Sequence, residues 1–337
     1  MSRDLDLTRQ PAQPCVRCGK PTDAPVYLGD QKVPMCQDCS IPFEDYLAEK
    51  HGAPLPPPPV LYRYRAPSDV ESGKDGGPSR FEQFLTTDQV WASNPTEFND
   101  PYDCRQTYDF AASPEVWEKR VAEGIVGRLA GLLRDVGKLP PEREEHLKAL
   151  GVELKKEAKY NDPAVQADMG CLTQESLNQA RVLCLCETQT NPRLWAHYSD
   201  GHRGFCLEFD ATLEPFCYAY RVRYTRDYPK LDINASPDLC MRTFLLTKSE
   251  LWKDEEEWRC VEFLGGPAQW SIPKQALKAV IFGTRVKPKV RATITQLIAA
   301  HKPWVELREV VEVPFSYDLQ VRSLPGAAAA GISLAEP

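Results

Sequence analysis

Four cysteines close to the start of the chain have the spacing of a metal site. Cys15 and Cys18 form one C-x-x-C pair, Cys36 and Cys39 form a second, and seventeen residues separate the pairs. Two residues between paired cysteines let a tight turn direct both thiolates at one ion, and two such pairs complete a tetrahedral sulfur shell. The spacing therefore predicts a structural zinc ion, because no coordination position is left open for a substrate.

Three later segments are richer in polar and aromatic residues than a packed core requires. The first is the strand-like Leu61–Arg65 with the loop Phe98–Pro101, the second is Trp195–Gly204, and the third is Lys248–Arg259. Strict alternation over Leu61–Arg65 places the two arginines on one face and the two tyrosines on the other. In the third segment, a strand that began before residue 258 would place Glu255, Glu257 and Arg259 on one face.

Taken in order, these segments resemble the bacterial domain of unknown function 2971. That family has a first strand with tyrosine and arginine, an F-N-D-P loop, a W-x-x-Y segment leading to G-x-x-x-x-F, and a K…W…E-x-E-x-R segment. The corresponding stretches here are Leu61–Arg65, Phe98–Pro101, Trp195–Phe209 and Lys248–Arg259, and a later I-x-F-G motif is only partly matched. The resemblance spans roughly residues 60–315, leaves the cysteine module out, and implies no established activity.

The same order of motifs is also similar to that of ADP-ribosyltransferases. Cleavage of the nicotinamide–ribose bond of NAD needs a carboxylate at the ribose, a cation for the pyrophosphate and an aromatic surface for the nicotinamide. The resemblance implies Glu257 as the catalytic carboxylate and Glu255 as the residue that orients the acceptor. It implies Arg63 or Arg65 as the phosphate ligand, although the serine-threonine-serine motif of that family has no counterpart here.

The candidate site follows from both resemblances and from the residue types. Tyr198 or Trp195 would stack on the nicotinamide ring of NAD. The catalytic candidates are Glu257 and Glu255, and the ligand-binding candidates are Arg63, Arg65, Asn99, Asp100, Trp195, His197, Tyr198 and Arg259. NAD is the implied cofactor or substrate, beside the structural zinc.

Structural roles compete with these assignments. The two arginines of the first strand could pair with Glu255, Glu257 or Asp100 in an ion network across the sheet, since a buried arginine needs such a partner. A structural role is favoured for His197 and His202, which bracket a turn. Asn99-Asp100-Pro101 is also typical of an Asx turn. Cys184 and Cys186 alternate with leucines on a strand, which favours buried packing.

Bulk properties limit the class of protein. Charged residues make up 26% of the 337, apolar residues 42%, and the formal charge is −7. An acidic chain does not coat duplex nucleic acid through a global positive field, and residues 1–59 are themselves more acidic than basic. The sequence shows no apolar run of membrane-spanning length and no secretory leader. We expect a cytoplasmic protein with a small-molecule or protein partner.

The chain divides into four parts by composition. We expect a zinc-ribbon-like module at 1–51 with a hairpin over Pro25–Pro34, a Pro-rich linker at 52–59, one domain at 60–322, and a tail at 323–337. The large domain alternates short strands and helices, with a helical insertion over about 113–180. This pattern is typical of an α+β fold with a mixed or antiparallel sheet.

Two functions remain open from the sequence. The leading one is an enzyme acting on a phosphate- and ribose-containing ligand such as NAD, by ADP-ribosyl transfer or hydrolysis. The alternative is a non-enzymatic, zinc-containing module that recognises protein or nucleic acid, in stress response or phage defence. A pocket in which Arg63, Arg65, Tyr198, Glu255 and Glu257 converge would favour the enzyme, and residues that do not share a cleft would count against it.

Overall fold

The computed structural model describes residues 57–71, 76–105, 162–232, 243–262 and 266–324, with gaps between them. It also describes the backbone of short strands within 13–34 and at 107–109, and a few helical positions between 141 and 149. The four cysteines of the predicted zinc site, the Pro-rich linker up to residue 56 and the tail from residue 325 lie outside the described residues.

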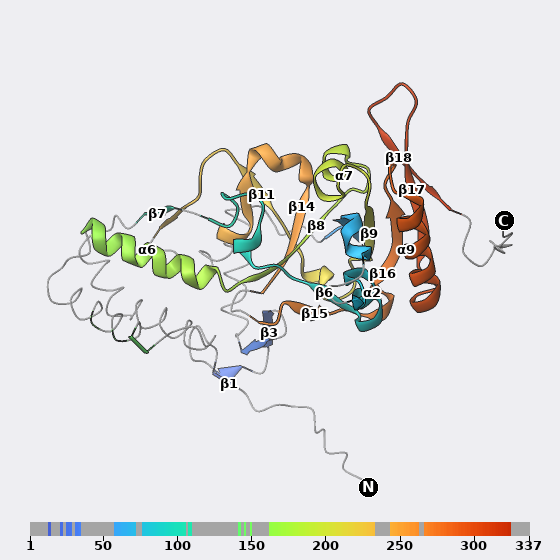
Figure 1. Ribbon diagram of the computed structural model, residues 1–337. Helices are drawn as coiled ribbons and strands as arrows, with labels where there is room; N and C mark the ends of the chain where they lie inside the picture. Colours follow the sequence, from blue (N-terminus) through green and yellow to red (C-terminus); the bar gives the residue numbers. More distant parts are fainter. Residues whose placement is uncertain are drawn as a thin grey trace, which may run out of the picture.

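Within these residues an eight-stranded sheet organises the domain (Figure 1). Its strand order is β10-β14-β8-β5-β9-β16-β17-β18, and every neighbouring pair is antiparallel except β16–β17. The strands are β5 Val60–Arg65, β8 Arg181–Cys186, β9 Phe205–Asp210, β10 Tyr220–Arg221, β14 Glu257–Glu262, β16 Leu277–Phe282, β17 Glu306–Glu312 and β18 Leu319–Ser323. The sheet is mixed and the fold is α+β, which confirms that part of the expected fold class, whereas the zinc module and most of the expected helical insertion lie outside the described residues.

Helices and short turns cover this sheet. The α-helices are α2 Arg80–Thr87, α6 Pro163–Leu177, α7 Pro192–Tyr198 and α9 Pro288–His301. The 3-10 turns are η1 Pro67–Val70, η3 Pro95–Glu97, η5 Phe216–Tyr218, η6 Glu250–Glu255 and η7 Lys274–Ala276. Helix α9 forms the crossover that joins the parallel strands β16 and β17, as such a connection requires. Figure 1 shows α6 at the end of the molecule opposite to α9.

Five two-stranded pairs complete the described structure. They are β1 Gln13–Pro14 with β2 Pro21–Thr22, β3 Pro25–Leu28 with β4 Gln31–Pro34, β6 Gln89–Trp91 with β15 Gln269–Ser271, β7 Thr107–Asp109 with β12 Lys230–Asp232, and β11 Arg223–Thr225 with β13 Thr247–Ser249. The antiparallel pairing of β3 with β4 confirms the hairpin expected over Pro25–Pro34.

Strand alternation separates the two faces of the sheet. On one face Leu61 joins the large apolar core with residues of α2, β9, β14, β16 and α9. On the other face Tyr62 and Tyr64 pack with Cys186 and Trp195, so α7 lies over that face. A smaller apolar cluster around Cys104, Val182 and Phe244 continues this second face toward β14. Cys184 packs against this cluster.

Two glycines allow close packing at one end of β5. An added Cβ at Gly204 would lie 2.0 Å from the Arg65 carbonyl oxygen, and one at Gly283 would lie 2.3 Å from the His202 carbonyl oxygen. The Gly283 amide donates to the Gly204 carbonyl at 3.0 Å. The turn that leads from α7 into β9 is therefore pressed against β5 and β16, which fixes the position of α7.

One segment with the alternation of a strand does not form a single strand. The aromatic alternation from Phe216 to Tyr224 predicts a continuous strand, but the structure has the turn η5 followed by the short strands β10 and β11. Residues Phe216 and Val222 are buried, whereas Tyr218 is exposed. The alternation therefore reflects burial on both sides of a bend rather than one extended strand.

Candidate functional site

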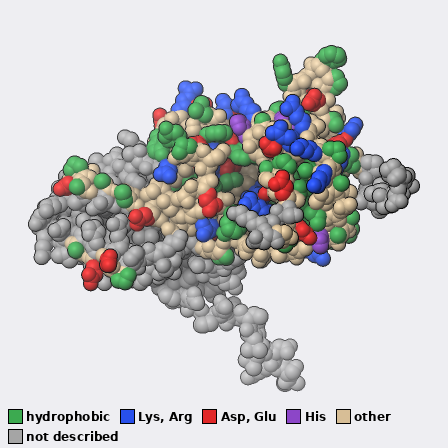
Figure 2. All heavy atoms as spheres, in the orientation of Figure 1, with side chains coloured by type: hydrophobic (Ala, Val, Ile, Leu, Met, Phe, Trp, Pro, Cys, Tyr) green, Lys and Arg blue, Asp and Glu red, His purple; other side chains and the backbone are tan. Residues whose placement is uncertain are grey.

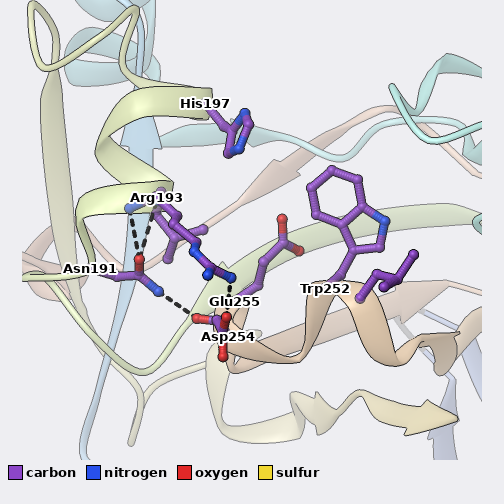
Figure 3. Close-up of a pocket in the computed structure, with 8 residues that line it drawn as sticks. Asn191, Arg193, His197, Trp252, Asp254 and Glu255 are labelled. Atoms are coloured by element: carbon purple, nitrogen blue, oxygen red, sulfur yellow. Dashed lines mark hydrogen bonds and ion pairs between the residues drawn. The ribbon is translucent and has the colours of Figure 1, made fainter.

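A pocket of about 200 Å³ lies between α7 and η6. Figure 3 shows the Glu255 carboxylate in this pocket, with His197 above it and Trp252 beside it. Residues of only two elements and their flanks line it, namely Asn191, Arg193, Leu194, His197, Leu251, Trp252, Asp254 and Glu255.

Local sequence signals position both walls. Asn191 caps α7, because its side-chain oxygen accepts from the amides of Arg193 and Leu194, and proline occupies the first turn. The Asn191 amide group also donates to the Asp254 carbonyl, and Arg193 pairs with the Asp254 carboxylate, so the two walls are joined at the rim. Ser249 caps the other wall, η6, through the Leu251 amide at 3.4 Å.

The left-handed backbone of Glu256 separates the two candidate carboxylates. Its φ is 46°, and it ends η6 and turns the chain into β14. Glu255 therefore belongs to the turn and faces the pocket, whereas Glu257 is the first residue of the strand. Both side chains are almost fully buried, with 7% and 5% of their surface exposed.

Arg259 is the centre of a buried ionic cluster. Its guanidinium is fully buried and binds the Asp103 carboxylate through two bonds of 3.1 and 2.6 Å. It binds Glu257 through bonds of 2.7 and 3.1 Å, and it donates to the Leu245 carbonyl at 2.7 Å. A buried arginine with two bidentate carboxylates is fully satisfied, so its role is structural.

Lys248 connects this cluster to the pocket. Its buried ammonium donates to Glu255 at 2.5 Å and to Glu257 at 3.0 Å, and it lies 3.6 Å from Asp103. The other oxygen of Glu255 accepts from the Tyr198 hydroxyl at 2.8 Å. Glu255 is thus the member of the cluster that reaches the pocket, and both of its oxygens are oriented by fixed donors.

Burial and neighbouring charges shift the pKa values of these groups in different directions. Burial alone would raise the pKa of Glu257, but Arg259 and Lys248 outweigh it and lower that pKa. The pKa of Glu255 is raised, because burial and the Glu257 charge outweigh Lys248. Burial opposes the charge of Lys248, yet Glu257, Asp103 and Glu255 together raise its pKa. Of these two glutamates, Glu255 therefore takes up a proton more readily.

Aromatic rings form the sides of the pocket. The His197 ring meets the Trp252 ring edge to face, with centroids 6.1 Å apart, and it contacts Tyr198 in the same way. The Lys248 ammonium lies 5.2 Å from the centre of the Trp252 ring. The Trp252 ring is thus placed to interact with a cation, and the aromatic sides of the pocket suit a flat or cationic group.

The structure brings part of the predicted site together. Glu255, Glu257, Arg259 and Tyr198 share one cluster, and His197 lines the adjoining pocket. Trp195 lies elsewhere, because its ring is fully buried against Tyr64 at 4.9 Å and its Nε1 donates to the Gln189 carbonyl. It is part of the core rather than a stacking surface.

The two arginines of β5 point away from the carboxylates. Register aligns Glu257 with Cys186, whose neighbours in the core are Tyr62 and Tyr64, so the carboxylates share the tyrosine face. Arg63 and Arg65 alternate to the opposite face, where Arg65 pairs with Asp69 of η1. The alternation itself was predictable, but the expected convergence of arginines and carboxylates in one cleft is not found.

The F-N-D-P loop has a structural role with one consequence for the site. Asp100 forms an Asx turn in which its side chain accepts from the Tyr102 amide at 2.9 Å, and Asn99 is exposed. The same turn directs Asp103 toward Arg259. Asp100 therefore positions the cluster from outside, and neither Asp100 nor Asn99 lines the pocket.

Three residues of the site escape sequence reasoning. Asp103 lies two residues after the F-N-D-P loop, and only its tertiary contact with Arg259 reveals its role. Lys248 and Trp252 belong to the K…W…E-x-E-x-R segment, so the signal that could have identified them is the spacing of that segment itself. A lysine buried beside three carboxylates is a partner that those carboxylates require.

Comparisons with known proteins match one segment. Residues 194–260 match the family model described as Protein of unknown function (DUF2971). The matched segment runs from α7 through the pocket and the lysine to Arg259, and it supports the family resemblance there. The chain has no match among curated proteins or among solved structures.

Two further observations concern the part of the chain that the structure describes. No helix there combines the length and the apolar character needed to span a bilayer. No group of three or more His, Cys, Asp and Glu side chains there is arranged to hold a metal ion. The three carboxylates that do converge are bound to Lys248 and Arg259 instead.

Proposed function

We propose that the pocket between α7 and η6 binds the nicotinamide riboside end of NAD and that the protein cleaves the bond between the two rings. Glu255 is the reacting carboxylate in this proposal, and transfer to water or to another acceptor completes the reaction. The observation that carries it is the position of Glu255, at the point where the aromatic pocket meets the buried cluster.

Charge complementarity supports a cationic ligand. When all of its members are ionised, the cluster contains two cations, Lys248 and Arg259, and three carboxylates, including Asp103. One negative charge is therefore in excess, beside the rings of His197 and Trp252. The nicotinamide ring of NAD carries a positive charge, and a cation of this kind is attracted both by an aromatic face and by a carboxylate.

The chemistry requires only groups that line or support the pocket. When the C1′–N bond breaks, its electron pair leaves with nicotinamide and positive charge develops on the ribose, where the Glu255 carboxylate stabilises it. Water or an acceptor group then bonds to C1′ and releases a proton. Tyr198 and Lys248 hold the carboxylate in place during this step, which limits the reorganisation that the reaction needs.

The roles differ from those implied by the motif order. Glu257 is assigned to the support of Lys248, because cations bind both of its oxygens. Arg193 replaces the β5 arginines as the cation for the pyrophosphate, since it is exposed at the rim of the pocket. In Figure 2, Lys and Arg side chains gather over the part of this face that carries α7.

Incubation of the purified protein with NAD tests the proposal, with free nicotinamide measured by chromatography. We expect release by the wild type and a loss of about 100-fold or more in Glu255→Gln, in line with the removal of a group that stabilises developing charge. Glu256→Gln is the matched control, because this neighbouring side chain lies outside both pocket and cluster. If the wild type releases no nicotinamide, or if Glu255→Gln releases as much as the wild type, the proposed NAD cleavage is contradicted.

A non-catalytic binding module is the second candidate. The small size of the pocket favours it, since about 200 Å³ suits a single side chain of a partner protein. The cationic head of lysine or arginine fits the same carboxylate and rings. Binding of NAD or of a lysine-containing peptide that Glu255→Gln abolishes, without any release of nicotinamide, would favour this candidate.

A further inference from the structure

The mouth of the pocket is closed by Asp254. Asn191 caps α7, Arg193 belongs to the first turn of that helix, and Asp254 lies near the end of η6. The Arg193 guanidinium donates to the Asp254 carboxylate, and the Asn191 side-chain amide donates to the Asp254 carbonyl oxygen. Figure 3 shows both of these side chains reaching from α7 toward Asp254. One residue of η6 therefore holds the two walls together at the rim.

The closed pocket is small for a nucleotide. Its volume is about 200 Å³, whereas pockets that hold drug-sized ligands usually measure about 300–1,000 Å³. A single flat ring suits the space between the aromatic side chains, but the ribose and the phosphate attached to such a ring extend toward the rim. The groups at the rim therefore decide which ligands the pocket accepts.

The rim is held less firmly than the interior of the pocket. Glu255 is almost fully buried, and Tyr198 and Lys248 hold its carboxylate. By contrast, the side chains of Arg193 and Asp254 are 70% and 47% exposed. An exposed ion pair adds little to stability, because water and salt compete for both charges. This pair can therefore break while the buried carboxylate keeps its place.

The local structure of η6 also lets the rim open. The element is a 3-10 turn, whose hydrogen-bond geometry is poorer than that of an α-helix, and it ends at the left-handed Glu256. Leu251, another rim residue of η6, is 86% exposed. Asp254 and Leu251 can therefore move aside without uncovering the apolar core.

A phosphate group would compete with Asp254 for the same cation. A guanidinium binds carboxylates and phosphates through the same paired N–H donors. A phosphate monoester carries about −1.5 to −2 charges at neutral pH, so Arg193 attracts it more strongly than it attracts the singly charged carboxylate. In the closed pocket Asp254 thus occupies the position beside Arg193 that a phosphate of the ligand would take.

We propose that Asp254 is a built-in competitor for the phosphate of the ligand, and that Arg193 and Asp254 together make the pocket select phosphorylated ligands. On binding, Arg193 exchanges the Asp254 carboxylate for the phosphate, and the rim opens. The cationic ring then lies beside Glu255, between the rings of His197 and Trp252. This inference rests on the proposed function, since it takes the same ligand, but it concerns recognition rather than cleavage.

Binding of two stable analogues to the full chain tests the competition. The probes are carbocyclic nicotinamide riboside and its 5′-phosphate, in which a cyclopentane ring replaces the ribose ring and the bond to nicotinamide does not break. Calorimetry gives the Kd of each probe, and the ratio of the two Kd values measures the preference for phosphate. We expect the wild type to prefer the phosphorylated probe. Asp254→Asn should increase this preference by up to about fivefold, the range of an exposed ion pair, and Arg193→Met should abolish it.

The other end of η6 provides a matched control. Glu250 pairs with Arg226 at 2.5 Å, and neither residue lines the pocket. Glu250→Gln therefore removes an ion pair of the same turn and should keep the ratio of the wild type. Asp254→Asn should also increase the ratio less when Arg193→Met is present, because no cation is then freed for the phosphate.

The outcomes separate this inference from the proposed cleavage. A wild type that favours the unphosphorylated probe, or an Asp254→Asn variant whose ratio is not raised, overturns the competition and leaves the cleavage in place. A ratio that follows the variants, without nicotinamide release from NAD, supports the competition and contradicts the cleavage alone. If neither probe binds the wild type, the pocket does not take this ligand and both proposals are overturned.

Discussion

At the scale of single residues, Arg259 determines whether the buried cluster is stable. Its guanidinium holds Asp103 and Glu257 together, and these two residues are separated by most of the domain in sequence. Lys248 alone would face three carboxylates if the arginine were removed. The cluster is therefore stable as a complete set, and the loss of one member exposes the cost of burying the others.

Arg259→Met should lower the free energy of unfolding by about 3–5 kcal/mol, because it leaves two buried carboxylates without their main partner. Urea denaturation measures this loss. Arg221→Met, which removes a half-exposed arginine, should cost no more than about 1 kcal/mol and serves as the control. Equal effects of the two variants would contradict a structural role for Arg259.

The pH dependence of nicotinamide release follows from the raised pKa of Glu255. The carboxyl acts in its ionised form, so the rate should fall as the pH drops through a pKa above the usual range of glutamate. Below that pKa the pocket also loses the charge that attracts the cationic ring. Initial rates between pH 4.5 and 8 measure the profile, and a profile without an acidic limb would exclude Glu255 as the reacting group.

At the scale of elements, the position of α7 depends on close contacts between backbones. The helix has only seven residues, and its own hydrogen bonds cannot fix its orientation. The Asn191 cap holds its start, and the glycines after it let the following turn pack against β5 and β16. Any residue that separates these backbones should also displace His197 and Tyr198 from Glu255.

Gly204→Ala tests this dependence. The new Cβ would meet the Arg65 carbonyl oxygen at 2.0 Å, and a backbone atom cannot move aside cheaply. We expect a loss of stability at or above the upper end of the about 1–3 kcal/mol usual for overpacking. Gly266→Ala is the control, because its Cβ would meet only a flexible side chain at 3.6 Å. Similar unfolding midpoints for both variants would contradict the close contact.

The sequence predicts the strands better than it predicts the face of the sheet on which their side chains lie. Alternation in Leu61–Arg65 correctly separates arginines from tyrosines. Helix α7 is too short to show a helical period. The face that carries Glu257 depends on the register between β14 and β8, which is a tertiary property. For this reason the motif order correctly grouped Glu255, Glu257, Arg259 and Tyr198 in space but misplaced their relation to Arg63.

At the scale of the whole molecule, the predicted N-terminal zinc module has to be tested separately from the pocket. Cys15, Cys18, Cys36 and Cys39 lie outside the described residues, so the zinc site stays a prediction from their spacing. The hairpin β3–β4 lies between the two pairs, where a zinc-ribbon-like module would have one. The module is too small to bury a core of its own, so its folding should depend on the metal.

Elemental analysis of the purified full chain should find one zinc ion per molecule. Chelation should make residues 15–50 sensitive to protease and leave the larger domain resistant, because a structural metal supplies the folding energy of its own module only. Cys36→Ser should behave like the chelated wild type, whereas Cys171→Ser, at an exposed free cysteine, should keep the metal. A metal-free wild type that resists protease would contradict the module.

The apolar cluster that backs Arg259 has a consequence for how this domain can vary. Cys104 and Ala180 both belong to that cluster, so the chain leaves it and returns to it after some seventy-five residues. The chain between these two points includes β7, which pairs with β12, and the helix α6. Doubling the length of such a connection costs only about 0.6 kcal/mol in closure entropy. A short linker, or a foreign domain, in place of the residues between β7 and α6 should therefore leave the pocket intact.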